Sequence, residues 1–146
     1  AIERNEVPPK FKGNPAIELV VLNDAVDHLA EMINALRSAE RQYRQLFSND
    51  ITGNFISTPR GEIIDCNPAF IRMYGLASLE DAKERGVLQL WGSVQGQEKV
   101  IESLKEHGRL YHQEIQVQRV DGTLLFGRQN LVGIYGEEGE LSQVQG

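Results

Sequence analysis

The sequence predicts an α+β fold: an antiparallel five-stranded sheet with helices on one face, preceded by a long amphipathic N-terminal helix. Three observations support this. Between residues 51 and 75 a strand, a turn and a second strand lead directly into a capped helix. Helical segments then follow to residue 107, and three strand-like segments joined by short turns complete the chain. Strands joined by short turns pair antiparallel, and helices cover the face that forms the core.

The composition is ordinary for a soluble globular protein, with 40% hydrophobic and 25% charged residues among 146. The formal charge of −6 argues against a phosphate-binding surface, so we expect no nucleic-acid partner. No apolar run approaches the roughly 20 residues of a membrane helix, and the start lacks a signal-peptide pattern. Cys66 is the only cysteine, which suits a reducing compartment. We therefore expect a cytoplasmic chain without membrane contact.

Residues 1–14 are predicted to be a flexible lead-in, because they are polar, charged and interrupted by Pro8 and Pro9. Asn14 and Pro15 then supply a cap and a first helical residue. The helix that they open, residues 15–47, would span roughly 50 Å at about 1.5 Å per residue. Residues 48–146 form the predicted globular domain.

Apolar residues of this helix recur in alternating steps of three and four, as in a coiled coil. They are Leu19, Leu22, Val26, Leu29, Ile33 and Leu36. Their identities favour a parallel two-stranded coil, and hence a homodimer. Glu40 interrupts the series, and the flanking positions lack clear charge pairs. Because the apolar stripe is broad, the alternative is a helix packed on the sheet of its own domain.

The first hairpin and its helix have clear local signals. Residues 54–58 and 62–66 are the two strands, and Pro59-Arg60-Gly61 is the turn between them. Asn67 can cap the following helix, Pro68 suits its first position, and Gly75 suits its exit.

The remaining elements follow in order. Ser78 and Asp81 have the spacing of a capping box for a short helix through Arg85. Residues 86–93 are expected to be irregular, and residues 94–107 to be helical with an exit at Gly108. Residues 110–120 alternate as a strand, with Tyr111, Gln113, Ile115 and Val117 on one face. A tight turn at Asp121-Gly122 leads to a strand over 123–135, and a last strand covers 140–145.

This order resembles the PAS domain family over residues 43–146. The resemblance rests on Leu46-Phe47, on the N-P-A-F run after the first hairpin, on the aromatic-glycine helix end, and on the R-x-D-G turn at residues 119–122 with Glu114 before it. It implies a sensory module of a prokaryotic signal-transduction protein, such as a sensor histidine kinase of a two-component system. It also implies a dimerising leading helix that passes signals, and a last strand that runs on into an output domain beyond residue 146.

The resemblance places a small-molecule pocket between the sheet and the short helices. Polar residues that strand alternation could turn inward are Asn54, Gln113 and Gln129, with Arg72 and Tyr74 at the rim. Trp91 could be a stacking wall for a flavin, and the alternative is that it packs in the core or at the rim. A buried amide without a partner costs roughly 1–3 kcal/mol. Each amide therefore needs a ligand, a water or an internal partner, unless it lies on the surface.

No cofactor is predicted. The segment in which flavin-binding light sensors of this family carry their reactive cysteine is here residues 86–91, which contain none. The one histidine in the helix that ligates haem in gas sensors is His107, in its last turn. A flavin or haem sensor is kept as one alternative, and a ligand-free interaction module as another.

We expect no catalysis by this chain. His28, His107 and His112 lie on three different elements and show no metal-binding spacing. Cys66 with His107 or His112 is the only conceivable thiol–imidazole pair, and a lone cysteine at a strand end is usually a small core residue.

Overall fold

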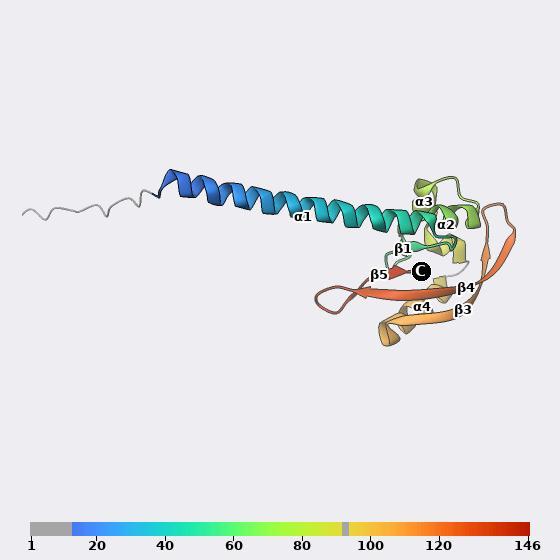
Figure 1. Cartoon of the computed structure of the whole chain (residues 1–146). Coiled ribbons are helices and arrows are strands. Elements are labelled where there is room, and N and C mark those ends of the chain that lie inside the picture. Colours follow the sequence, from blue (N-terminus) through green and yellow to red (C-terminus); the bar gives the residue numbers. More distant parts are fainter. Residues whose placement is uncertain (1–12, 92–93) are drawn as a thin grey trace, which may run out of the picture. The chain divides into compact units, whose positions relative to one another are not determined.

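The computed structural model describes residues 13–91 and 94–146, and side chains only outside 88–95. Its elements are α1 (Pro15–Asn49), β1 (Phe55–Ser57), β2 (Ile63–Cys66), α2 (Pro68–Tyr74), α3 (Leu79–Trp91), α4 (Val94–His107), β3 (Arg109–Gln118), β4 (Leu124–Tyr135) and β5 (Leu141–Gln145). The predicted order of strands and helices is confirmed (Figure 1). The predicted lead-in lies outside the described residues, except for its last two.

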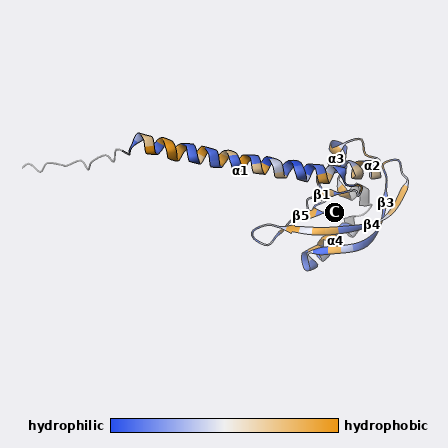
Figure 2. Cartoon of the chain, in the orientation of Figure 1, coloured by the Kyte–Doolittle hydropathy of each residue, from blue (hydrophilic) through white to orange (hydrophobic). Residues whose placement is uncertain are grey.

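Helix α1 is continuous over 35 residues, and the chain divides into two compact units after Tyr43. The Asn14 side-chain oxygen accepts a hydrogen bond from the Ala16 amide at 3.1 Å, as expected of a cap. No residue of α1 is buried. The six apolar side chains of the predicted coiled-coil seam, from Leu19 to Leu36, are between 41% and 71% exposed. Orange, apolar residues recur along α1 between blue, polar ones (Figure 2). Among the described helices, none combines the length and hydropathy of a membrane span.

Residues 44–146 contain the five-stranded antiparallel sheet, in the order β2-β1-β5-β4-β3. The first hairpin therefore lies beside the last strand, where Ile56 pairs with Gln145. Helices α2, α3 and α4 come between β2 and β3 in the sequence. Helices α3 and α4 pack on the sheet, and α2 contacts β1 through the rings of Phe70 and Phe55. This is the predicted fold class.

The core of this unit lies between the sheet and the three helices. Its buried side chains include Phe55, Phe70, Tyr74, Val87, Leu104, Val117, Leu131 and Val144. The Phe70 ring lies 5.4 Å from that of Phe55 and 4.4 Å from that of Tyr74, between centroids. These contacts join the first hairpin to α2.

Both ends of α2 are formed as the sequence predicts. The Asn67 side-chain oxygen accepts a hydrogen bond from the Phe70 amide at 2.9 Å, and Pro68 follows at the start of the helix. Gly75 ends the helix in the left-handed conformation, at φ 71°, where a side chain would be strained.

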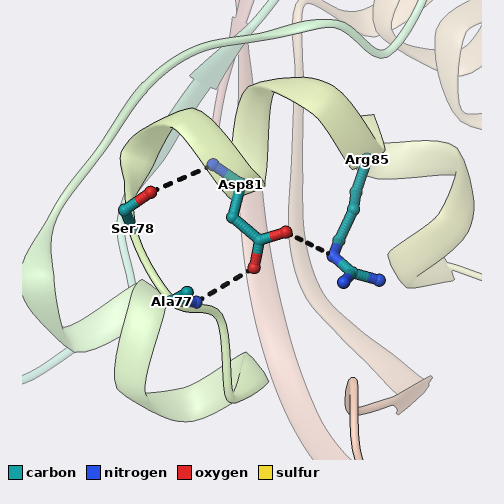
Figure 3. A network of polar contacts seen from close by, with 4 residues as sticks. All are labelled: Ala77, Ser78, Asp81 and Arg85. Atoms are coloured by element: carbon teal, nitrogen blue, oxygen red, sulfur yellow. Dashed lines mark hydrogen bonds and ion pairs between the residues drawn. The ribbon is translucent and has the colours of Figure 1, made fainter.

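The start of α3 is a network of three side-chain contacts (Figure 3). The Ser78 hydroxyl accepts from the Asp81 amide at 3.2 Å. The Asp81 carboxylate accepts from the Ala77 amide at 3.0 Å and from Arg85 Nε at 2.7 Å. The predicted cap is confirmed, but the predicted irregular segment after Arg85 is wrong in part. The backbone kinks at Gly86 and then resumes helical geometry to Trp91.

Strand β3 departs from the simple alternation that the sequence suggested. Its ladder with β4 shifts register between Leu110 and Gln113, and His112 has a φ of 56°. Tyr111, expected on the inward face with Ile115 and Val117, is 50% exposed as a result. One extra residue in a strand turns the side chains before it to the other face. The sequence gives no local signal for this bulge.

Candidate functional site

A cavity of about 200 Å³ lies between α4 and the β3–β4 ladder. Its described lining residues are Gly96, Gln97 and Val100 from α4, Glu114, Ile115, Gln116 and Val117 from β3, and Gln129 from β4. Sites for drug-sized ligands are roughly 300–1,000 Å³. This cavity therefore suits a smaller molecule.

The cavity lining combines apolar side chains with three glutamines and one glutamate. Gln97 is buried and Gln129 half-buried, whereas Gln116 and Glu114 are exposed. Ile115 and Val117 face inward from β3, and Val100 faces them from α4. The carboxamides of Gln97 and Gln129, the two glutamines that are not fully exposed, can each donate and accept. Such a site suits a small ligand with one polar group and an apolar remainder.

Gln97 is a site residue that the sequence analysis missed. It is only 7% exposed, and its side-chain nitrogen donates to the Pro59 carbonyl oxygen at 3.2 Å. A signal was present, because Gln97 shares a helical face with Ile101 and Leu104 through steps of four and three. A glutamine within an otherwise apolar stripe is a candidate for an inward polar group.

The turn of the first hairpin is held against α3 by a close contact between the two backbones. The Val87 amide donates to the Gly61 carbonyl oxygen at 2.7 Å. A side-chain carbon on Gly86 would lie 2.9 Å from that oxygen, and the φ of Gly86 is 67°. Only glycine fits at position 86. The bond from Val87 to Gly61 holds the turn to α3, and the bond from Gln97 to Pro59 holds it to α4.

Of the six predicted ligand residues, Gln129 lines the cavity. Asn54 instead donates to the Asp50 carboxylate at 2.8 Å, in the loop before β1. Gln113 is exposed next to the β3 bulge, and its side-chain nitrogen donates to the Tyr111 carbonyl at 3.3 Å.

The two rim candidates, Arg72 and Tyr74, do not line the cavity. Arg72 is exposed on α2. Tyr74 is 4% exposed and packs against Phe70 in the core. Trp91 ends α3, and its side chain lies outside the described part.

A larger and more open depression, about 450 Å³, lies outside α4 beside the hairpin turn. Its charged lining residues are Arg60, Glu98, Glu102 and Lys105. Because positive and negative side chains both line this depression, it favours neither anionic nor cationic ligands. The smaller cavity is therefore the better candidate for a ligand site.

The residues considered for catalysis and haem binding do not fit those roles. Burial, and secondarily the charge of Asp65, raises the pKa of the Cys66 thiol from 9.0 to about 11. A nucleophilic thiol needs the opposite change. His107 is exposed and bonds to the Ser103 carbonyl, and it does not line the cavity. Within the described residues, no cluster of three potential metal ligands occurs.

The fold and cavity define a class: a small α+β domain with a partly open cavity between a helix and the sheet. The family model for the PAS domain matches residues 51–145. The chain therefore belongs to the PAS domain family. No curated protein matches it.

Solved structures agree with this family. The PAS domain of a Colwellia psychrerythraea protein is 25% identical, with a TM-score of 0.60, and the match covers 73% of this chain and 92% of that one. A domain of a sensory box sensor histidine kinase/response regulator from Geobacter sulfurreducens is 21% identical, with a TM-score of 0.60 and coverages of 75% and 92%. The PAS domain of a LuxR-family transcriptional regulator from Burkholderia thailandensis, solved with ethanol, is 20% identical, with a TM-score of 0.58 and coverages of 70% and 92%.

Proposed function

We propose that this chain is the sensory part of a larger signal-transduction protein, such as a sensor histidine kinase of a two-component system. Membership of the PAS domain family supports a sensory role rather than catalysis. In this proposal a small molecule in the cavity beside α4 changes the packing of the domain, and α1 passes the change on to an output domain in the same parent chain.

The observation that carries the proposal is the apolar seam of α1. Its six side chains, from Leu19 to Leu36, lie on one helix face and are all exposed. A single helix cannot bury its own stripe, so the stripe needs a partner surface. The heptad spacing fits a second copy of the same helix, which makes a parallel homodimer the proposed assembly.

Cavity size and chemistry support a ligand smaller than a flavin or haem. We propose a molecule with an apolar part and one group that hydrogen-bonds to the carboxamides of Gln97 or Gln129. We propose no nucleic-acid partner and no membrane contact for this chain. The proposal places the domain in the cytoplasm, where a free thiol such as that of Cys66 persists.

Light scattering on the whole chain tests the assembly. The wild type is expected to be a dimer, and Leu29→Glu with Ile33→Glu a monomer with an unchanged thermal transition of the globular part. Glu31→Ala, on the polar face of the same helix, is the control and should remain a dimer. A double variant with unchanged mass would favour packing of α1 on its own sheet.

Thermal shift with a panel of small alcohols, amides and carboxylates tests the sensory part. A stabilising compound should lose its effect in Gln129→Leu, which removes one amide at nearly constant volume. If no compound shifts the transition and native mass spectrometry finds nothing bound, the ligand-free interaction module becomes the better account. A coloured protein with visible absorbance would favour the cofactor sensor.

A further inference from the structure

The side chain of Asn67 is completely buried, at 0% exposure, and all four of its hydrogen-bonding positions are used. Its oxygen accepts from the Phe70 amide at 2.9 Å and from the Asn54 amide at 2.9 Å. Its nitrogen donates to the Phe47 carbonyl at 3.0 Å and to the Thr52 carbonyl at 2.8 Å. One carboxamide thus joins the end of α1, the loop before β1 and the start of α2.

Capping α2 alone does not require asparagine. Only the bond from the Phe70 amide is needed for that, and serine, threonine or aspartate can accept it equally well. Aspartate when ionised has no proton to donate, and a hydroxyl has one. Only a carboxamide can accept twice and donate twice, so the other three bonds explain why this position needs asparagine.

The loop between α1 and β1 is closed by further hydrogen bonds. The Asp50 amide donates to the Leu46 carbonyl at 3.1 Å, which continues α1. The Asp50 carboxylate accepts from the Asn54 side chain at 2.8 Å, and the Asn54 carbonyl accepts from the Asn67 amide at 2.9 Å. Opening the last turn of α1 would therefore disturb the groups that hold Asn67.

We infer that Asn67 is a positioning residue that couples the last turn of α1 to the first turn of α2, so that the two helix ends open and close as one unit. Removing the two hydrogen bonds that Asn67 donates would allow the two helix ends to open independently. If α1 carries a signal, as the proposed function states, this carboxamide is a point through which rearrangement of the domain reaches it. The coupling itself does not depend on dimer formation.

Amide hydrogen exchange on the whole chain, resolved by residue, tests the coupling. Gln45→Gly weakens the exposed end of α1, and Gln45→Ala is its matched control. A mid-helix glycine favours local opening roughly fivefold relative to alanine. Exchange of the Phe70 amide should rise severalfold, up to that factor, in Gln45→Gly and not in Gln45→Ala. The Leu131 amide, in the centre of the sheet, reports global opening, in which α1 is open as well. It should exchange more slowly than the Phe70 amide in both variants, which shows that Phe70 exchanges through a local opening.

The same comparison in an Asn67→Ser background completes the cycle. Serine keeps a capping oxygen for α2 but cannot donate to both Phe47 and Thr52, so Gln45→Gly should no longer affect Phe70. An unchanged Phe70 amide in the first comparison overturns the inference, even if Asn67→Ser fails to fold. A Phe70 amide that exchanges no faster than the Leu131 amide, or an equal effect of Gln45→Gly in both backgrounds, overturns it too. A monomer by light scattering would refute the proposed dimer while leaving this result intact.

Discussion

The side-chain nitrogen of Asn67 lies 3.0 Å from the carbonyl oxygen of Phe47, twenty residues earlier in the chain. This bond connects the leading helix to the domain that follows, and it comes from the residue that also caps α2. Asn67, at which the first hairpin leads into α2, therefore also contacts the last turn of α1.

Replacement of Asn67 by alanine should be among the more damaging single changes to the described part of the chain. It removes a helix cap, about 1 kcal/mol, and leaves buried backbone groups without partners, about 1–3 kcal/mol. We expect a loss of about 2–4 kcal/mol in the free energy of unfolding, measured by urea denaturation. Ser78→Ala removes only a cap and should lose about 1 kcal/mol. Equal losses for the two variants would contradict the role of Asn67.

Gly86→Ala should destabilise the chain more than Gly108→Ala. Both residues have a positive φ, at 67° and 77°. A side-chain carbon at Gly86 meets the Gly61 carbonyl oxygen at 2.9 Å, whereas at Gly108 it meets nothing within 4 Å. We expect a loss of about 1 kcal/mol at Gly108 from backbone strain and about 3 kcal/mol at Gly86. A Gly86→Ala variant as stable as Gly108→Ala would mean that the hairpin turn is not held against α3.

The capped start of α3 should contribute to stability in a pH-dependent way. Hydrogen bonds from the Ala77 amide and then from Arg85 lower the pKa of Asp81 below its usual value. The contribution is therefore complete above the unfolded-state pKa, about 3.9, and is lost as the pH falls through the lower folded-state pKa. Thermal unfolding should show wild type more stable than Asp81→Asn at pH 7, with the gap closing below about pH 4. Val144→Ala, an apolar core change, should show a gap that does not vary with pH.

The Cys66 thiol should react slowly in the native protein. Its pKa of about 11 in place of 9.0 lowers the thiolate fraction roughly 100-fold at neutral pH, and burial restricts access further. Reaction with a disulfide reagent at pH 8 should be at least about 100-fold slower in the folded than in the urea-unfolded chain. Comparable rates in the two states would show that the thiol is accessible and would reopen a chemical role for it.

Much of the fold could be predicted because its signals are local. Asn67, Pro68 and Gly75 specify the two ends of α2 by their own chemistry, and Ser78 with Asp81 specifies the start of α3. The β3 bulge was not predictable in this way, because it depends on pairing with β4. A shift of one residue there places Tyr111 in solvent.

The candidate site was predicted less well than the fold, and for a related reason. Strand alternation predicts inward polar groups, and it succeeds for Gln129, which lines the cavity. Its register partner Gln113 is exposed and does not line the cavity, and its side chain donates to the Tyr111 carbonyl within the bulge. Gln97 lies on a helix, where strand alternation does not apply, although its helical spacing with Ile101 and Leu104 indicates burial.

Disulfide cross-linking between copies tests the central claim, a parallel pairing of α1, most directly. Leu29 lies in the seam, so a Leu29→Cys variant places two thiols opposite each other, within the 4.4–6.8 Å between Cα atoms that a disulfide usually requires. Glu31→Cys lies on the outer face of the same helix. Under mild oxidation we predict rapid formation of a covalent dimer by Leu29→Cys and little by Glu31→Cys. Equal rates for the two variants, or no covalent dimer with Leu29→Cys, would contradict the account.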